Sequence, residues 1–138
     1  MPSYSRDVTV RLRDTDAAGV IYFTSLLVFA HETFERYLDA CERPLGRQLA
    51  EDDDLLPIVH CEADYRRGVT VGDRLTVEMA VDAIGESSFT LAYTLRRNGD
   101  EVGRCRIVHA SLGRRSLLSV PLPAVVRDHL RELSGGSG

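Results

Sequence analysis

The chain has 138 residues, of which 43% are hydrophobic and 28% charged, and its formal net charge is −4 at pH 7. This is the size and composition of one ordinary globular domain. An acidic chain lacks the clustered positive charge that nucleic acids and anionic membranes require, so neither is an expected partner. All 17 basic residues are arginine. Without lysine the chain can form no Schiff base and cannot supply the phosphate-binding lysine of a P-loop, which excludes several enzyme classes.

Cysteine and histidine usage gives no sign of a disulfide framework or a metal site. The cysteines are odd in number and lack C-x-x-C spacing, which indicates reduced thiols: Cys41, Cys61 and Cys105. The four histidines lie in different segments without zinc-site spacing; we interpret His31 as an interface or solvent-facing residue, and His60 and His109 as hydrogen-bonded strand residues. The chain shows neither a signal segment nor the roughly 20 apolar residues of a membrane span. We expect a cytoplasmic protein with no cofactor and no metal.

The first third of the chain predicts a strand, a loop and a long helix. Residues 7–13 alternate apolar and polar side chains, with Val8, Val10 and Leu12 on the buried face. A loop follows at residues 14–19. Residues 23–40 then change to a helical period, with Thr24 or Ser25 available to cap the first turn. The apolar stripe of this helix is expected at Leu27, Ala30, Phe34, Tyr37, Leu38 and Cys41.

The remainder predicts mainly strands, after a connection at residues 43–54 with room for one short helical turn. Runs of alternating residues indicate strands at 59–66, 74–81, 89–95 and 102–112, and a short run at 117–120 is a candidate further strand. The pair Asn98-Gly99 is a strong hairpin signal. Two prolines at positions 121 and 123 lead into a helix that carries Val126, Leu130 and Leu133.

This order of elements predicts an α+β fold with one long helix laid across an antiparallel sheet of about five strands. Residues 1–133 are expected to form the single domain. Residues 134–138 consist only of serine and glycine and are expected to be disordered. Such a sheet has open edges, and a chain of this size needs a second subunit to enclose a large ligand, so we expect a homo-oligomer.

The segment Asp14-Thr15-Asp16-Ala17-Ala18-Gly19 stands out because it places two acidic residues between a strand and a helix. Aspartate is favoured in turns and near helix N-termini, so the local pattern by itself leaves both a structural and a catalytic role open. The chain has no G-x-S-x-G sequence of a serine hydrolase, which leaves these carboxylates as the strongest candidates for chemistry.

The run from Arg11 to Phe23, followed by a helix with His31-Glu32 and by Leu56-Pro57-Ile58-Val59, resembles the hotdog-fold acyl-CoA thioesterases of the 4-hydroxybenzoyl-CoA thioesterase type. Within that group it looks most like the cyanobacterial 1,4-dihydroxy-2-naphthoyl-CoA hydrolase branch of phylloquinone (vitamin K1) biosynthesis. The resemblance implies a hotdog fold, in which the sheet wraps around the long helix. It also implies a dimer of dimers with the active site at the dimer interface.

By this resemblance Asp16 is the catalytic carboxylate, as nucleophile or general base, and Asp14 is mainly structural. Unpaired amides in the first turn of the helix, at Tyr22 and Phe23, would hold the oxyanion. Gly19 would let the loop backbone approach the thioester. Broad-range relatives carry histidine where this chain has Phe23, whose ring could line a pocket for an aromatic acyl group.

The phosphates of CoA need cations, and arginine suits them well. The favoured candidates are Arg114 and Arg115; Arg66, Arg67, Arg104 and Arg106 are alternatives. The expected activity is thus hydrolysis of an acyl-CoA, with 1,4-dihydroxy-2-naphthoyl-CoA as the best single candidate. A broader acyl-CoA or acyl-carrier-protein thioesterase and a non-catalytic acyl-CoA binding module remain alternatives.

Overall fold

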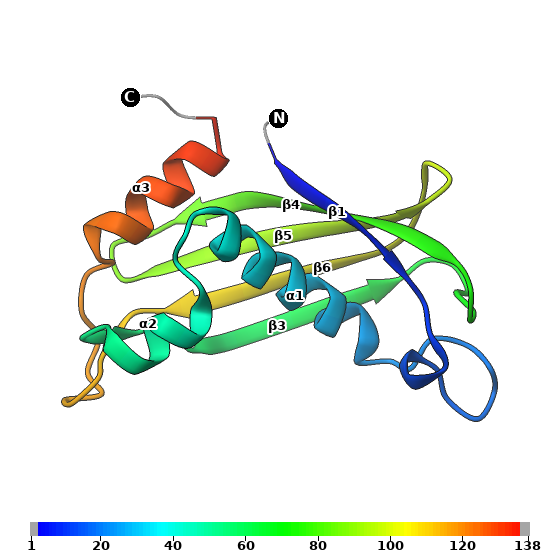
Figure 1. Ribbon diagram of the computed structural model, residues 1–138, viewed down its shortest axis with the longest axis horizontal. Helices are drawn as coiled ribbons and strands as arrows, with labels where there is room; N and C mark the ends of the chain where they lie inside the picture. The colour runs from blue at the N-terminus through cyan, green and yellow to red at the C-terminus, as the bar shows by residue number, and fades with distance from the viewer. Residues whose placement is uncertain (1–2, 136–138) are drawn as a thin grey trace.

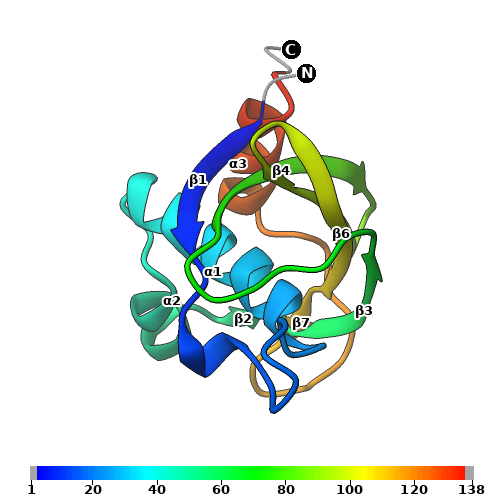
Figure 2. The ribbon, with the colours of Figure 1, turned by 90° about the vertical axis from the view of Figure 1, so that its right-hand side faces the viewer.

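A five-stranded antiparallel sheet in the order β1-β4-β5-β6-β3 curves around the long helix α1 (Figures 1 and 2). The structure, a computed structural model, describes residues 3–135. The expected α+β hotdog fold is therefore confirmed. The strands of this sheet are β1 (Tyr4–Thr9), β3 (Ile58–Tyr65), β4 (Arg74–Ile84), β5 (Ser88–Arg97) and β6 (Asp100–Ala110). A two-stranded sheet joins β2 (Asp54–Leu55) to β7 (Leu112–Gly113).

Helix α1 (Ser25–Ala40) supplies one side of the core. Its buried face partly matches the expected stripe, because Ala30, Phe34, Tyr37 and Leu38 are buried. The first half of the helix is rotated from expectation: Leu26 and Phe29 are buried, whereas Leu27 is only half-buried. The curved sheet covers more of the helix circumference than a flat sheet would, so periodicity alone could not choose between Leu26 and Leu27.

The start of α1 sits directly on strand β6. A Cβ atom added at Gly103 would lie 2.6 Å from Leu26 Cδ1 and 3.1 Å from the Asp64 carbonyl oxygen. Any side chain at position 103 would therefore push the first turn of the helix away from the sheet. Gly103 thus fixes the height of the helix N-terminus above the sheet.

Strand β1 ends earlier than the alternating pattern predicted. Its pairing with β4 stops at Thr9, and residues Leu12–Asp14 form a 3₁₀ turn. Val10 is fully buried, as expected, but Leu12 is 78% exposed. The expectation that Leu12 faces the core is therefore wrong, because the chain leaves the sheet before it reaches this residue.

The connections follow the sequence signals with one exception. Asn98 and Gly99 have φ values of 53° and 84° and form the hairpin between β5 and β6. Helices α2 (Leu45–Glu51) and α3 (Ala124–Leu133) occupy the expected segments, and Leu130 and Leu133 are buried. Residues 117–120 do not form a strand and contribute only a bridge between Ser119 and Leu112. In the tail, Ser134 N–H donates to the Leu130 carbonyl at 3.0 Å, and positions 136–138 lie outside the described residues.

Candidate active site

Residues 15–21, here called the Asp16 loop, connect the 3₁₀ turn to α1 and project from one end of the molecule (right in Figure 1). Tyr22 N–H donates to the Asp14 carbonyl at 2.7 Å and closes the base of the loop. Within it, Asp16 N–H donates to the Val20 carbonyl and Gly19 N–H to the Asp16 carbonyl, both at 3.0 Å. Gly19 has a φ of +81°, which favours glycine at this position.

The two aspartates have different environments. Asp14 is 8% exposed, and its carboxylate accepts the Arg11 N–H at 2.8 Å, so it is a structural residue as expected. Asp16 is exposed at the tip of the loop, where its Oδ1 accepts the Ala18 N–H at 2.8 Å. Within residues 3–135, Asp16 Oδ2 has no hydrogen-bond partner. One oxygen thus orients the carboxylate, and the other is free to act on a ligand.

The beginning of α1 differs from expectation at Tyr22. Its amide is already engaged with the Asp14 carbonyl, so Tyr22 does not offer the free donor that was predicted. The Phe23 amide, by contrast, has no acceptor among the residues that the structure describes. The Phe23 side chain is 63% exposed, and its ring centroid lies 4.7 Å from that of Tyr22. An unpaired amide at a helix N-terminus beside an exposed aromatic surface suits an oxyanion next to an apolar group.

A second loop, between β3 and β4, supports the Asp16 loop. Ile21 N–H donates to the Val69 carbonyl at 2.8 Å, and Val20 forms an isolated antiparallel β-bridge with Thr70. This support depends on Asp73, whose carboxylate accepts the Thr70 N–H at 3.0 Å and pairs with Arg97 at 2.7 Å. The hydrogen bond from the Thr70 amide, together with Arg97, lowers the pKa of Asp73. The glycine and aspartate at positions 72 and 73 signal a turn in the sequence, but nothing in the pattern identifies the Asp16 loop as its partner.

The favoured arginine pair does not join Asp16 in the protomer. Arg114 Nε donates to the Asp52 carbonyl at 2.7 Å, and its Nη2 donates to the Leu49 carbonyl at 2.5 Å. These bonds satisfy carbonyl groups around the C-terminus of α2, so Nε and Nη2 of Arg114 already have acceptors in the protomer. Arg115 is exposed on the loop after β7, which lies at the opposite end of the molecule from the Asp16 loop (orange in Figure 1).

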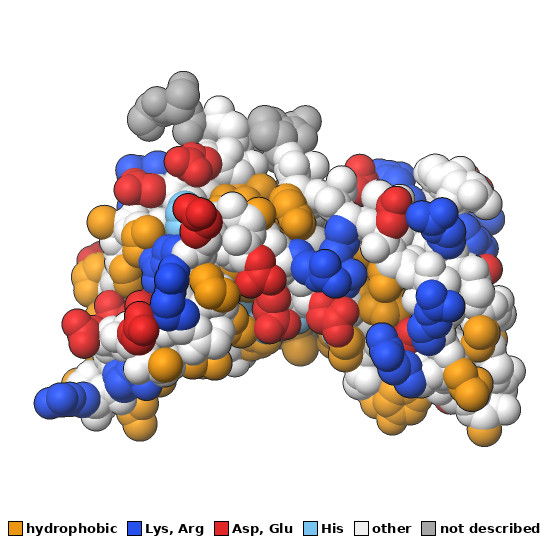
Figure 3. All heavy atoms as spheres, viewed as in Figure 1, with side chains coloured by type: hydrophobic (Ala, Val, Ile, Leu, Met, Phe, Trp, Pro, Cys, Tyr) orange, Lys and Arg blue, Asp and Glu red, His pale blue; other side chains and the backbone are white. Residues whose placement is uncertain are grey.

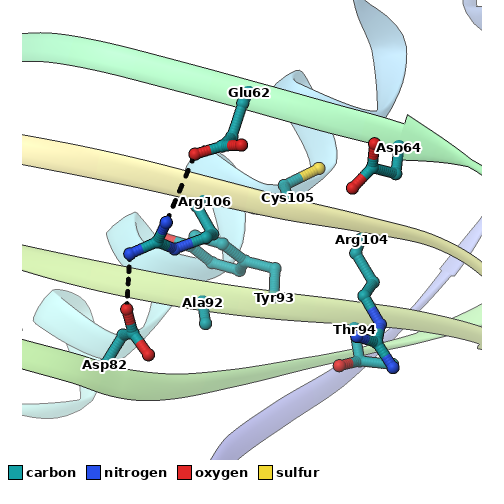
Figure 4. Close-up of a pocket in the computed structure, with 9 residues that line it drawn as sticks. All are labelled: Glu62, Asp64, Asp82, Ala92, Tyr93, Thr94, Arg104, Cys105 and Arg106. Atoms are coloured by element: carbon teal, nitrogen blue, oxygen red, sulfur yellow. Dashed lines mark hydrogen bonds and ion pairs between the residues drawn. The ribbon is translucent and has the colours of Figure 1, made fainter.

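Arg104 and Arg106 lie on the outer face of the sheet and belong to two separate ion-pair clusters, of which the one around Arg106 is drawn in Figure 4. Arg106 pairs with Asp82 at 2.7 Å and with Glu62 at 3.4 Å, and these carboxylates raise its pKa. Arg104 Nε donates to Glu101 at 2.8 Å. The face is lined by alternate residues of β3, β5 and β6 that point away from α1, so both arginines stand across the sheet from the helix.

An apolar cavity of about 330 Å³ lies between α1, α2 and the start of β3, and we call it the α1–α2 cavity. Its lining includes Leu38, Leu45, Leu55 and Ile58, together with His31 and His109. Sequence reasoning did not identify it, because its walls come from four separate segments. Within one protomer it lies near the middle and C-terminal half of α1, whereas Asp16 precedes the N-terminus of that helix.

His109 forms a wall of this cavity and is 2% exposed. Its Nδ1 lies 2.9 Å from the Leu56 carbonyl, which can only accept, so Nδ1 carries the proton and Nε2 is an acceptor. Burial lowers the pKa of His109 to about 4, and the neutral ring stacks on Phe89 with centroids 4.8 Å apart. The prediction of a hydrogen-bonded strand residue is confirmed. His31 also lines the cavity, and its Nδ1 lies 3.3 Å from Glu35.

Two further properties concern residues 3–135 as a whole. No group of three or more His, Cys, Asp or Glu side chains in this range is placed to hold a metal ion. No helix in the same range combines the length and apolar character needed to cross a bilayer.

Comparison with known proteins places these features in a family. Residues 10–130 match the Thioesterase-like superfamily. A 1,4-dihydroxy-2-naphthoyl-CoA hydrolase of Synechococcus elongatus is 36% identical over 132 residues, which cover 95% of this chain and 97% of that protein. A hydrolase of the same name from Prochlorococcus marinus is 38% identical over 111 residues, or 75% of this chain and 72% of that protein. The crystal structure of a 1,4-dihydroxy-2-naphthoyl-CoA thioesterase from Synechocystis superposes with a TM-score of 0.89 at 26% identity, covering 95% of this chain and 97% of that one. With its match over most of the chain and its Asp16 loop before a long wrapped helix, this protein belongs to the Thioesterase-like superfamily.

Proposed function

We propose that the protein hydrolyses an aromatic acyl-CoA thioester, with 1,4-dihydroxy-2-naphthoyl-CoA as its substrate, in the cytoplasm and as a step of phylloquinone biosynthesis. The observation that carries this proposal is the Asp16 carboxylate, which is exposed, oriented by the Ala18 amide and followed by a helix start with an unpaired amide at Phe23. The names of the relatives in Synechococcus and Prochlorococcus support the choice of acyl group.

The chemistry requires an attacking oxygen and a site for the charge that develops on the thioester oxygen. Two routes fit Asp16. Its carboxylate attacks the carbonyl carbon, expels CoA thiolate and forms a mixed anhydride that water then cleaves; alternatively, it takes a proton from a water that attacks directly. In both routes the Phe23 amide donates to the developing oxyanion, in place of the Tyr22 amide. The products are the free acid and CoA thiol.

A dimer formed through strand β3 completes this proposed site. The outer edge of β3 has no partner strand in the described sheet, and Ile58, Val59 and Tyr65 are 45%, 59% and 44% exposed. An open edge with apolar side chains favours pairing with a second copy. Hydrophobic side chains also gather along the lower margin of the molecule in Figure 3, the side on which β3 lies in Figure 1. A twofold axis at β3 relates only two copies of the chain. The dimer of dimers expected from the family requires a second interface and remains part of the proposal.

Antiparallel pairing of two β3 strands sets the Ile58 end of one copy beside the Tyr65 end of the other. The Tyr65 end adjoins the Asp16 loop, since Tyr65 shares a groove with Val20 and Ile21. The Ile58 end forms part of the α1–α2 cavity. The dimer therefore brings the cavity of one protomer toward Asp16 of its partner copy. A cavity of about 330 Å³ with apolar walls suits a fused aromatic ring.

The test is CoA release from a panel of thioesters, with the wild-type protein beside Asp16→Asn. The panel contains 1,4-dihydroxy-2-naphthoyl-CoA, benzoyl-CoA, phenylacetyl-CoA and a long-chain acyl-CoA. We expect preference for the naphthoyl thioester and a loss of about 10²- to 10⁴-fold in kcat in the variant, because an amide neither attacks nor accepts the proton. Activity that persists in Asp16→Asn contradicts the mechanism, and a protein that releases CoA from no thioester is a binding module.

Hydrolysis in ¹⁸O-labelled water separates the two routes. In the anhydride route, label enters the Asp16 carboxylate when water attacks the enzyme-derived acyl carbon, because the aspartate then receives an oxygen from water; attack on the substrate acyl carbon labels only the product. Label in Asp16 is therefore diagnostic of the anhydride route. The general-base route leaves Asp16 unlabelled. Mass spectrometry of the peptide that contains Asp16 reads the difference.

A further inference from the structure

A groove of about 370 Å³ runs beside the Asp16 loop. One wall is formed by Val20 and Ile21, at the end of that loop, and the other by Tyr65, Arg66 and Arg67, where the chain leaves β3. The two walls are joined by main-chain hydrogen bonds, among them the bond from Ile21 N–H to the Val69 carbonyl at 2.8 Å. The groove and Asp16 therefore belong to one hydrogen-bonded unit.

The two arginines of the groove are incompletely neutralised. Arg66 Nε lies 3.5 Å from the Glu101 carboxylate, which also accepts Arg104 Nε at 2.8 Å, so one carboxylate faces two guanidinium groups. Arg67 is exposed, and its side chain has no ion-pair or hydrogen-bond partner within residues 3–135. The groove therefore carries positive charge that the carboxylates within residues 3–135 do not fully neutralise.

Two of the other candidate arginines already have partners within the protomer. Arg106 is held between Asp82 and Glu62, and Arg114 is bonded to carbonyl groups around the end of α2. Arg115 is exposed but lies at the opposite end of the protomer from its own Asp16 loop (Figure 1), so it could reach this groove only from the partner copy. Arginine side chains also gather at the end of the molecule that carries the Asp16 loop, on the right in Figure 3.

The backbone below the two arginines is fixed. The N–H groups of Arg66 and Arg67 both donate to the Val102 carbonyl, at 2.9 and 3.2 Å. This shared acceptor holds the start of both side chains against β6, while the Arg67 guanidinium has no partner within residues 3–135. A planar guanidinium on a fixed base is suited to bidentate binding of phosphate oxygens.

We propose that Arg67, with Arg66, binds the phosphate groups of CoA, and that the groove walls at Tyr65 and Val20 guide the pantetheine arm from there to Asp16. This assignment rests on the proposed acyl-CoA substrate. It replaces Arg114 and Arg115 as the nucleotide site and places that site on the protomer that supplies Asp16.

Calorimetric titration with free CoA tests the assignment without turnover. The variants are Arg67→Ala and, as the competing candidate, Arg115→Ala, an exposed arginine that only the partner copy could bring to this groove. We expect Arg67→Ala to weaken CoA binding about tenfold, the loss of one phosphate contact, which corresponds to about 1.4 kcal/mol. Arg115→Ala should change the dissociation constant less than twofold. Binding to the wild type should weaken with added salt, and less steeply so in Arg67→Ala.

Kinetics give a second readout. For an acyl-CoA, Arg67→Ala should raise KM about tenfold and leave kcat unchanged, whereas hydrolysis of the matching N-acetylcysteamine thioester, which has no phosphate, should be unaffected. Unchanged CoA binding in Arg67→Ala, or weaker binding in Arg115→Ala alone, overturns the assignment. If CoA binds through Arg67 but no thioester is hydrolysed, the proposed function fails and the phosphate site stands. If thioesters are hydrolysed and Arg67→Ala is indistinguishable from wild type in both assays, the function stands and the phosphate site fails.

Discussion

The Asp14 carbonyl accepts the Tyr22 N–H at 2.7 Å, and this bond closes the loop that presents Asp16. The same carbonyl accepts the hydroxyl of Ser25, the first residue of α1, at 3.0 Å. Asp14 therefore ties the base of the loop to the start of the helix through its main chain, while its side chain fixes the preceding turn.

Replacing Ser25 by alanine should loosen this connection. Ser25 is buried, so losing its hydrogen bond should lower the free energy of unfolding by about 1 kcal/mol. We also expect a several-fold lower kcat with little change in KM, because the Phe23 amide would be less well positioned. Urea unfolding and steady-state kinetics measure the two effects. Ser5→Ala is the control: Ser5 is exposed on β1, and its substitution should alter neither quantity.

Gly19 should not tolerate a side chain even though it has room for one. A Cβ atom there would have no neighbour within 4 Å, but the φ of +81° costs a non-glycine residue about 1 kcal/mol. Gly19→Ala should therefore reduce stability by about that amount and reduce kcat/KM through a shifted Asp16. Gly46→Ala in α2, also without close neighbours, has no positive φ and should be neutral or stabilising. Equal effects of the two substitutions would contradict this explanation.

His109 predicts a pH dependence of stability. Burial holds the pKa of His109 at about 4, below its ordinary value of 6.5, so the unfolded chain takes up a proton first as the pH falls. The free energy of unfolding therefore has its full value above about pH 6.5. It falls between there and about pH 4, by an amount on the order of 3 kcal/mol. His109→Phe keeps a ring to stack on Phe89 but cannot titrate. Its free energy of unfolding, although lower overall, should vary less over this range; an unchanged slope would refute the assignment.

The proposed dimer can be tested at its edge. Val59 is 59% exposed on β3, so Val59→Arg should place a charge in the interface and weaken dimerisation at least tenfold. Sedimentation velocity measures the assembly, and CoA release should fall in parallel, because each site draws on both copies. Val125→Arg provides the control, since Val125 is 39% exposed on α3, away from the β3 edge. A Val59→Arg protein that sediments like the wild type rules out this edge as the interface.

The sequence predicted those parts of the fold whose signals are local. Asn98 and Gly99 both need positive φ in a tight hairpin, so their pairing identified the turn between β5 and β6. Leu12 was misassigned because alternation cannot show where a strand leaves its neighbour. The Leu26 and Leu27 positions were misjudged because burial around α1 depends on the curvature of the sheet, which is set by distant strands.

The same distinction applies to the candidate site. The position of Asp16 on a loop before the long helix was predictable because the loop, its turn and the helix are contiguous in sequence. Tyr22 was misassigned, since the engagement of its amide with Asp14 depends on how the loop closes. The hydrogen bonds of Arg114 could not be predicted, because its acceptors at Leu49 and Asp52 lie more than sixty residues away. The Arg66–Arg67 groove depends on a contact between two loops that no local pattern records.

The way in which the Asp16 loop is anchored makes it an exchangeable unit. The hydrogen bonds that hold it to Asp14 and Val69 are made by main-chain atoms, which are the same for every residue except proline. Residues 15–20 could therefore be replaced by the corresponding segment of another hotdog protein without altering β1, α1 or the β3–β4 loop, provided that Ile21, whose side chain is buried in the core, is kept. Grafting of this kind would let the reactive group be varied while the scaffold and its ligand-binding walls stay constant.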